Sequence, residues 1–333
     1  MKKILTRIIT SATVAVMSLC LFSSCRKEEE KLTKITVNEV AHSVFYAPQY
    51  AAIALGFFEE EGLDIELICG NGADKVMASV LSGESQVGLA GPEASIYVYL
   101  EGKENHAVIF SQLTKRDGSF LVSRNQEPDF TFDNLKGKYI IGGRAGGVPL
   151  MTLLYTLKQK GLDPEKDLTV DSSVQFAMMA GAFTAGTGDY VTLFEPTASS
   201  VVREGKGHIV ASIGEISGEI PYTAYFANKN YIKDNPEIIE KFTRAVTKGQ
   251  KWVDTHTAEE IAKVIAPYFP DNDLELLTEV TKRHKDIDAW NTNGIMTEES
   301  FNRLQDVMES AGELEKRVVM NEIVDNSFAE KVK

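Results

Sequence analysis

Two glycine-rich turns are the segments of this sequence best suited to hold a small ligand. The first is Ala90-Gly91-Pro92-Glu93, and the second runs from Gly142 to Pro149 and contains Arg144, Ala145, Gly146 and Gly147. Each turn follows a predicted strand and opens a predicted helix. Each would therefore present unpaired backbone N–H groups and the positive end of a helix dipole to a ligand. The structural alternative is that these glycines only permit close packing.

Side chains near three other strand ends could contact the same ligand. His42, Phe45 and Tyr46 follow the first predicted strand, and an aromatic ring there could stack on a planar ligand or only staple the next helix. Glu195 follows a strand, where its carboxylate could accept from an amine, or simply favour the start of a helix. The predicted ligand-binding residues are His42, Phe45, Tyr46, Gly91, Pro92, Glu93, Arg144, Ala145, Gly146, Gly147, Glu195 and Tyr222.

No catalytic or metal-binding motif accompanies these residues in the sequence. HExxH, GxSxG and CxxC are absent, and Val148-Pro149 stands where a phosphate-binding loop requires Lys-Ser/Thr. The five histidines are scattered without the paired spacing of metal ligands. We therefore predict no enzyme activity, no cofactor and no metal site.

The elements that must position these turns alternate along the chain between short apolar runs and helix-like stretches. Strands are predicted at 34–40, 65–69, 86–90, 106–113, 119–124, 139–141, 168–171, 190–194, 208–213 and 222–228, with helices between most of them. This order indicates an α/β fold with two mostly parallel sheets flanked by helices. From residue 236 onward the pattern is helical, and we expect this tail to pack on one of the two units.

The simplest arrangement of these elements is a discontinuous first lobe with a second lobe inserted into it. We expect lobe 1 to comprise residues 34–122 and 223–333, and lobe 2 to comprise residues 123–222. The chain would cross between them at two extended stretches, near 119–126 and 220–228. Two crossings make a hinge, and the space between the lobes makes a ligand-binding cleft.

Composition and charge limit the classes of partner. The 333 residues are 43% hydrophobic and 25% charged, which is ordinary for a globular protein of about two domains. The formal net charge is −13 and no basic run is present, which argues against a nucleic-acid partner and against a polybasic membrane patch.

The first residues have the features of an export signal rather than of a fold. Lys2, Lys3 and Arg7 precede an apolar run too short to span a membrane, and Leu21-Phe22-Ser23-Ser24-Cys25 resembles a bacterial lipobox. We predict a signal peptide at 1–24, lipidation of Cys25 and a polar tether at 25–33; an ordinary secretory signal with a chance cysteine is the alternative. Cleavage would change the formal charge to −16 and leave only Cys69 with a free thiol.

A longer pattern resembles one known family. The segment from Tyr46-Ala47-Pro48 through Gly56-Phe57-Phe58 to Gly62-Leu63-Asp64 is similar to the opening of bacterial substrate-binding proteins of ABC importers, in the branch for nitrate, sulfonates, taurine and thiamine-pyrimidine precursors. Asn134-Leu135-Lys136-Gly137-Lys138 and Phe194-Glu195-Pro196 also match it. The resemblance implies a two-lobed type II periplasmic-binding-protein fold and a monomeric receptor. Its partners would be a small-molecule ligand and an ABC permease with ATPase subunits.

The residues expected near the cleft favour one ligand class within that branch. Glu93 and Glu195 would disfavour an anion, whereas Phe45, Tyr46 and Tyr222 suit a flat, amino-bearing heterocycle of the thiamine-pyrimidine type. An alkylsulfonate, taurine or nitrate-like anion is the alternative, with Arg144 as its cation. A small-molecule enzyme and a sensor lobe are more remote alternatives. The mature chain lacks the cysteine-rich iron motif of the fungal synthases that the same branch contains.

Overall fold

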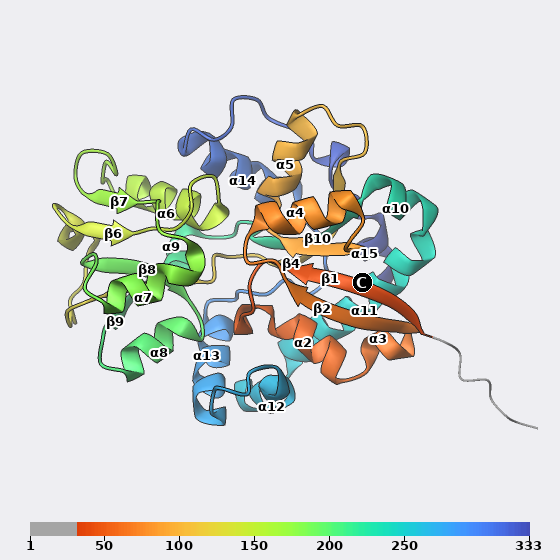
Figure 1. Cartoon of the computed structure of the whole chain (residues 1–333), viewed down its shortest axis with the longest axis horizontal. Coiled ribbons are helices and arrows are strands. Elements are labelled where there is room, and N and C mark those ends of the chain that lie inside the picture. The colour runs from red at the N-terminus through yellow and green to blue at the C-terminus, as the bar shows by residue number, and fades with distance from the viewer. Residues whose placement is uncertain (1–31) are drawn as a thin grey trace, which may run out of the picture. The chain divides into compact units, whose positions relative to one another are not determined.

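Two five-stranded sheets form the framework of residues 32–333, the part of the chain that the computed structural model describes (Figure 1). The first sheet has the order β2-β1-β3-β10-β4, and the second has the order β7-β6-β8-β5-β9. Their bounds are β1 (Thr33–Glu39), β2 (Leu63–Cys69), β3 (Val87–Ala90), β4 (Ala107–Thr114), β5 (Ser119–Ser123), β6 (Tyr139–Ile141), β7 (Thr169–Asp171), β8 (Tyr190–Phe194), β9 (His208–Ser212) and β10 (Thr223–Asn228).

One strand in each sheet runs against its neighbours. β10 is antiparallel to β3 and β4, and β5 is antiparallel to β8 and β9, whereas β1 and β3 are parallel and β6 is parallel to both β7 and β8. The predicted fold class, two mostly parallel sheets flanked by helices, is confirmed. The two reversed strands are the ones that follow the crossings between the lobes.

The chain passes between the two sheets twice, once after β4 and once before β10. The chain leaves the first sheet after Thr114 and enters the second at Ser119, which pairs with Phe194. β5 therefore belongs wholly to lobe 2, although the predicted boundary places residues 119–122 in lobe 1. The sequence could not show this, because an extended run does not itself specify which sheet it joins. The chain returns through residues 218–222 to β10.

Helices cover both faces of each sheet. Lobe 1 contains η1 (Val44–Tyr46), α2 (Ala47–Ala54), α3 (Phe57–Glu60), α4 (Ala73–Ser82) and α5 (Glu93–Leu100); lobe 2 contains η2 (Phe132–Leu135), α6 (Val148–Gln159), η3 (Phe176–Met178), α7 (Met179–Thr184), α8 (Thr197–Arg203) and α9 (Ile213–Ser217). Local residue chemistry sets several of these ends. Pro48 stands in the first turn of α2, and Gly83 ends α4 with a φ of 84° that favours glycine.

The remainder of the chain is helical and contacts both lobes, so the prediction that it packs on one of them is wrong. It comprises α10 (Lys229–Asp234), α11 (Pro236–Thr255), α12 (Ala258–Ile265), η4 (Ala266–Tyr268), α13 (Leu274–Asp286), α14 (Glu298–Ser310), η5 (Met320–Glu322) and α15 (Ser327–Val332). α11 packs on α2 and α3 of lobe 1, whereas α14 packs on α6 of lobe 2 (Figure 1). Asp273, which caps α13, pairs with Arg203 of α8 at 2.9 Å. Helical periodicity shows which face is apolar, but not which partner covers it.

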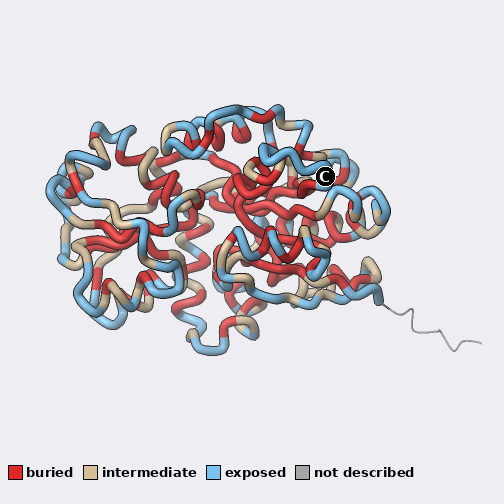
Figure 2. Tube along the Cα trace, turned by 45° about the horizontal axis from the view of Figure 1, so that its top comes forward, coloured by how far each residue is buried: buried red, intermediate tan, exposed pale blue. Residues whose placement is uncertain are grey.

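One large apolar cluster fills lobe 1 and continues into lobe 2, where it includes Val122, Met151 and Phe183 (Figure 2). In lobe 1 the ring of Phe242 from α11 lies 5.8 Å from that of Phe110 and 5.2 Å from that of Tyr225, centroid to centroid. In lobe 2 a separate cluster includes Leu121, Ile140 and Leu153. Among the described residues, no helix has the length and apolar character needed to cross a membrane.

Candidate functional site

A cavity of about 140 Å³ lies between the two lobes, where loops at the ends of both sheets converge. Lobe 1 contributes the loop after β1, the start of α4 and the turn before α5; lobe 2 contributes the loop between β6 and α6, η3 and the end of β8. Ligands of α/β proteins usually bind at such sheet edges. The cavity size suits a small molecule rather than a peptide.

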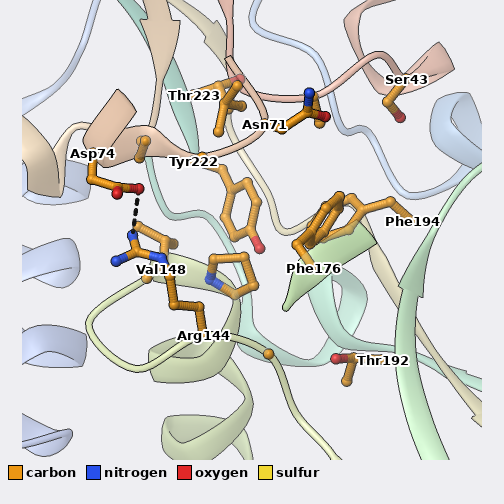
Figure 3. Close-up of a pocket in the computed structure, with 18 of the residues that line it drawn as sticks. Ser43, Asn71, Asp74, Arg144, Val148, Phe176, Thr192, Phe194, Tyr222 and Thr223 are labelled. Carbon is orange, nitrogen blue, oxygen red and sulfur yellow. Dashed lines mark ion pairs between the residues drawn. The ribbon is translucent and has the colours of Figure 1, made fainter. Parts of the chain in front are cut away.

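Three polar contacts join the lobes around this cavity. The Ser43 hydroxyl donates to the Glu195 carbonyl oxygen at 2.6 Å, and the Tyr97 hydroxyl donates to the Gly146 carbonyl oxygen at 3.1 Å. Arg144 reaches across to Asp74, with 3.9 Å between Nη2 and Oδ1 (Figure 3). The two lobes therefore touch on several sides of the cavity.

Aromatic rings form much of the cavity wall. Phe176 and Phe194 lie side by side with ring centroids 5.6 Å apart, and Tyr222 follows at 6.1 Å from Phe194 (Figure 3). The buried Tyr222 hydroxyl has no hydrogen-bond partner within residues 32–333. Such a wall offers ring faces for stacking and one hydroxyl for a polar ligand atom.

Glu93 is the buried acid of this cavity. Its residue is 3% exposed, and its Oε2 atom has no hydrogen-bond partner among the residues that the structure describes. Burial raises the pKa of the Glu93 carboxyl to about 7, against the opposing effect of Arg144 and nearby backbone N–H groups. A β-carbon at position 91 would lie 1.9 Å from Glu93 Oε2, so Gly91 leaves the space that the carboxyl occupies.

Glu195, by contrast, is held by protein partners. Its carboxylate accepts from the Ser199 amide and hydroxyl, both at 2.9 Å, and forms an ion pair with Arg283 of α13. It does not line the main cavity but an adjoining one of about 110 Å³. Glu195 thus joins α8 to the helical tail.

His42 lines the same adjoining cavity and lies in a charged contact. Its Nδ1 is 2.8 Å from Glu39 Oε1, and its Nε2 is 2.8 Å from the Tyr268 carbonyl oxygen. A carboxylate and a carbonyl oxygen are acceptors, so this arrangement favours the doubly protonated imidazole. The hydrogen bond to Glu39 correspondingly raises the pKa of His42.

Of the two neighbouring aromatic residues, only Tyr46 lines the main cavity. Phe45 is fully buried, packs on Tyr222 and His284, and accepts a 2.8 Å hydrogen bond from Trp290 Nε1 at its carbonyl oxygen. Phe45 and Trp290 are therefore core residues at the junction of the lobes.

The structure brings half of the predicted ligand-binding residues together. Tyr46, Gly91, Glu93, Arg144, Gly147 and Tyr222 line the main cavity; His42 and Glu195 line the adjoining one; Phe45, Pro92, Ala145 and Gly146 line neither. Cavity residues that the sequence analysis missed include Asn71, Asp74, Phe176, Thr192 and Phe194. No group of three or more metal-ligating side chains occurs within residues 32–333. Cys25 and the predicted signal peptide lie outside the described residues.

Comparison with known proteins places this architecture among binding proteins and their relatives. A family model described as "NMT1/THI5 like" matches residues 44–260. YtlA of Bacillus subtilis (strain 168), named as a proposed binding protein, is 43% identical over 321 residues, which cover 96% of each chain. The 4-amino-5-hydroxymethyl-2-methylpyrimidine phosphate synthase of Candida albicans (strain WO-1) is 23% identical over 66% of each chain.

A solved structure shares the whole fold at low sequence identity. The alkanesulfonate-binding protein SsuA from Xanthomonas axonopodis pv. citri, bound to MOPS, superimposes with a TM-score of 0.71. Its sequence identity is 15%, and the match covers 89% of this chain and 99% of that one. This similarity shows a common fold, which is that of periplasmic binding proteins.

Proposed function

Because the chain belongs to the NMT1/THI5-like family, we propose that it is an extracytoplasmic solute receptor of an ABC importer. In this proposal it binds a small aromatic amino-heterocycle of the thiamine-pyrimidine precursor type between its lobes. It then delivers this ligand to a permease with ATPase subunits. The naming of its 43%-identical relative YtlA as a proposed binding protein favours a receptor over an enzyme.

The chemistry of the cavity wall is the main support for the proposed ligand class. Phe176, Phe194 and Tyr222 offer aromatic surface, and the buried Glu93 offers an acceptor. Arg144, which lies within the second glycine-rich turn, is directed at Asp74. A flat ligand with an amino group satisfies these groups better than an anion does, because it uses both the aromatic surface and the buried acceptor. The two cations of the wall, Arg144 and Lys75, are offset by the carboxyl groups of Asp74 and Glu93.

The experiment that tests this class is identification of the ligand. Mass spectrometry of the purified protein should reveal a bound amino-heterocycle, and calorimetric titration should show binding of 4-amino-5-hydroxymethyl-2-methylpyrimidine. Saturating ligand should also stabilise the fold by about 2.7 kcal/mol at a hundredfold excess over Kd. Tight binding of taurine or an alkanesulfonate, with no heat from any pyrimidine, would contradict the proposed ligand class.

One observation favours a second candidate, an anion receptor. The contact between Arg144 and Asp74 is long, and the Arg144 side chain is 41% exposed, so a ligand anion could displace Asp74. The matching variant is Arg144→Ala. It should abolish binding of nitrate, taurine or an alkanesulfonate if the ligand is an anion, and should weaken binding of an uncharged heterocycle little.

We further propose that the receptor is anchored by lipid at Cys25 and faces outside the cytoplasm. Several acyl chains hold a protein on a bilayer where one chain holds it only marginally. Cys25→Ala should release the protein from membranes or leave its signal uncleaved. Unchanged membrane partition and gel mobility of this variant would contradict the anchor.

A further inference from the structure

One acid that lines the cavity, Glu93, has a carboxyl oxygen without a hydrogen-bond partner among the described residues. Glu93 Oε2 is buried and accepts no hydrogen bond within the described part of the chain, although almost all buried polar atoms in folded proteins are paired. Glu93 starts α5, and Gly91 provides the space for its carboxyl. A buried polar atom that faces a cavity and has no protein partner is a natural contact for a ligand atom.

We propose that Glu93 recognises an amidine-type edge of the ligand, a ring nitrogen beside an exocyclic amino group, through two parallel hydrogen bonds that share one proton. This inference rests on the proposed function and names the recognising residue and the chemical edge. The amino group donates to one carboxyl oxygen. The proton lies between the other oxygen and the ring nitrogen, so Glu93 binds a neutral ligand as the acid and a protonated ligand as the carboxylate.

The surroundings of Glu93 favour this shared proton. The charge of Arg144 lowers the pKa of Glu93. The Glu93 carboxylate in turn raises the pKa of three nearby phenols, those of Tyr46, Tyr97 and Tyr222. Asp74 and Lys75 of α4 line the same cavity. Arg144 is also drawn to Asp74. Burial raises the pKa of Glu93 to about 7, so the acid form is available near neutral pH.

A pH-linked affinity follows from the proton count. Below pH 7 the free site already holds the proton, and a neutral ligand binds without exchanging one with solvent. Above pH 7 the free site is a carboxylate, and binding must take up one proton. The Kd should then rise about tenfold for each further pH unit, because one bound proton links the two equilibria.

The experiment compares three forms of the full mature protein: wild type, Glu93→Gln and Glu93→Leu. Calorimetric titration at pH 6, 7, 8 and 9 uses 4-amino-5-hydroxymethyl-2-methylpyrimidine as the probe, in buffers of different ionisation enthalpy. The control probe is the analogue with hydrogen in place of the 4-amino group, which has the ring nitrogen but lacks the exocyclic donor. Melting temperatures show whether each variant is folded, and Asp117→Asn is measured in parallel because burial also raises the pKa of Asp117 to about 7.

We expect wild type to take up one proton per ligand above pH 7. It should bind the analogue without the 4-amino group at least about tenfold more weakly, as the loss of a hydrogen bond to a buried acid implies. Glu93→Gln should still bind the amino compound, because an amide also presents one donor and one acceptor, but without proton uptake. Glu93→Leu should fail to bind. Asp117→Asn should keep the pH dependence.

Several results would overturn the inference. Unchanged binding by folded Glu93→Leu, or a pH dependence that persists in Glu93→Gln, would remove Glu93 from recognition while the proposed function stands. If no amidine-edged compound binds wild type and an anion does, both the inference and the proposed ligand class fail. Tighter anion binding by Glu93→Gln than by wild type would identify that case.

Discussion

Glu93 and Glu195 occupy comparable places in the two lobes, but their surroundings differ. Each lies where a strand leads into a helix: Glu195 directly follows β8, and Glu93 is the first residue of α5 after the turn that follows β3. Each is at most 3% exposed. Glu195 has the Ser199 amide and hydroxyl and the Arg283 guanidinium as partners. Glu93 has an oxygen without any partner within residues 32–333. Equal burial thus accompanies two different roles, one structural and one open to a ligand.

The difference also shows in what each residue connects. The carbonyl oxygen of Glu195 accepts from Ser43 of lobe 1, and its side chain reaches the tail helix α13, so this residue holds three parts of the chain together. Glu93 lies against its own turn, where Gly91 accommodates it, and lines the cavity near the Val148 amide of lobe 2. We therefore expect changes around Glu195 to alter stability and changes at Glu93 to alter recognition.

The largest expected effect comes from removing the cation beside Glu195. Arg283→Leu should lower the free energy of unfolding by about 3–5 kcal/mol, because it leaves a buried carboxylate without its counter-ion. Urea denaturation measures this loss. The matched control is Arg303→Leu, whose ion-pair partner Glu299 is 84% exposed, and which should cost about 0–1 kcal/mol. Equal losses in the two variants would contradict the structural role of Glu195.

The contribution of Glu93 to stability should appear as a difference in pH dependence between wild type and Glu93→Gln. Its pKa is raised from 4.5 to about 7 in the fold, so the stabilisation from its protonated form is complete below pH 4.5 and is lost as the pH rises through 7. This loss should amount to about 3 kcal/mol between pH 4.5 and 8. Urea titrations of wild type and Glu93→Gln across this range should differ by that amount, since glutamine does not titrate. Parallel curves for the two proteins would refute the assignment.

Substitution of Glu195 tests whether this residue stabilises the fold or contacts the ligand. The sequence alone indicates a ligand contact for Glu195, whereas its observed partners indicate that Glu195→Gln should lower stability by about 1–3 kcal/mol as a charged hydrogen-bond network is weakened. The Kd of the folded variant for an amino-heterocycle should stay close to that of wild type. Calorimetry on the variant, below its melting temperature, decides between these outcomes. A large loss of affinity without a loss of stability would restore Glu195 as a ligand contact.

The smallest expected effect concerns the contact between lobes at Ser43. Ser43→Ala removes the 2.6 Å hydrogen bond to the Glu195 carbonyl oxygen, which should cost about 1 kcal/mol in the closed form. Since ligand binds between the lobes, this loss should appear as a Kd about fivefold higher. X-ray scattering with and without ligand gives a second readout, because the variant should need more ligand to reach the compact state. Unchanged affinity would mean that this contact also persists when the lobes open.

Local chemistry made the secondary structure predictable. Helical periodicity over 73–82, followed by Gly83, predicts a helix with the bounds that the structure shows for α4. The strands at 139–141 and 190–194 also match, since short apolar runs between glycines and polar turns leave little alternative. The residue pattern of 175–185 predicts one continuous helix and therefore does not indicate Phe176 as a cavity residue. In the structure a separate helical turn, η3, contains Phe176 at the cavity wall.

The elements, their order, the two glycine turns and the two-lobed topology follow from the sequence, because these depend on neighbouring residues and on chain connectivity. Which of two similar glutamates keeps an unpaired carboxyl oxygen depends on the folded structure. The partner of Glu195 is Arg283, 88 residues later on a helix whose packing on lobe 2 no local pattern specifies. The same reason separates Tyr46, which lines the cavity, from Phe45, which is buried against Trp290. Whether a buried polar group is left for a ligand depends on distant side chains, and these meet only when the chain has folded.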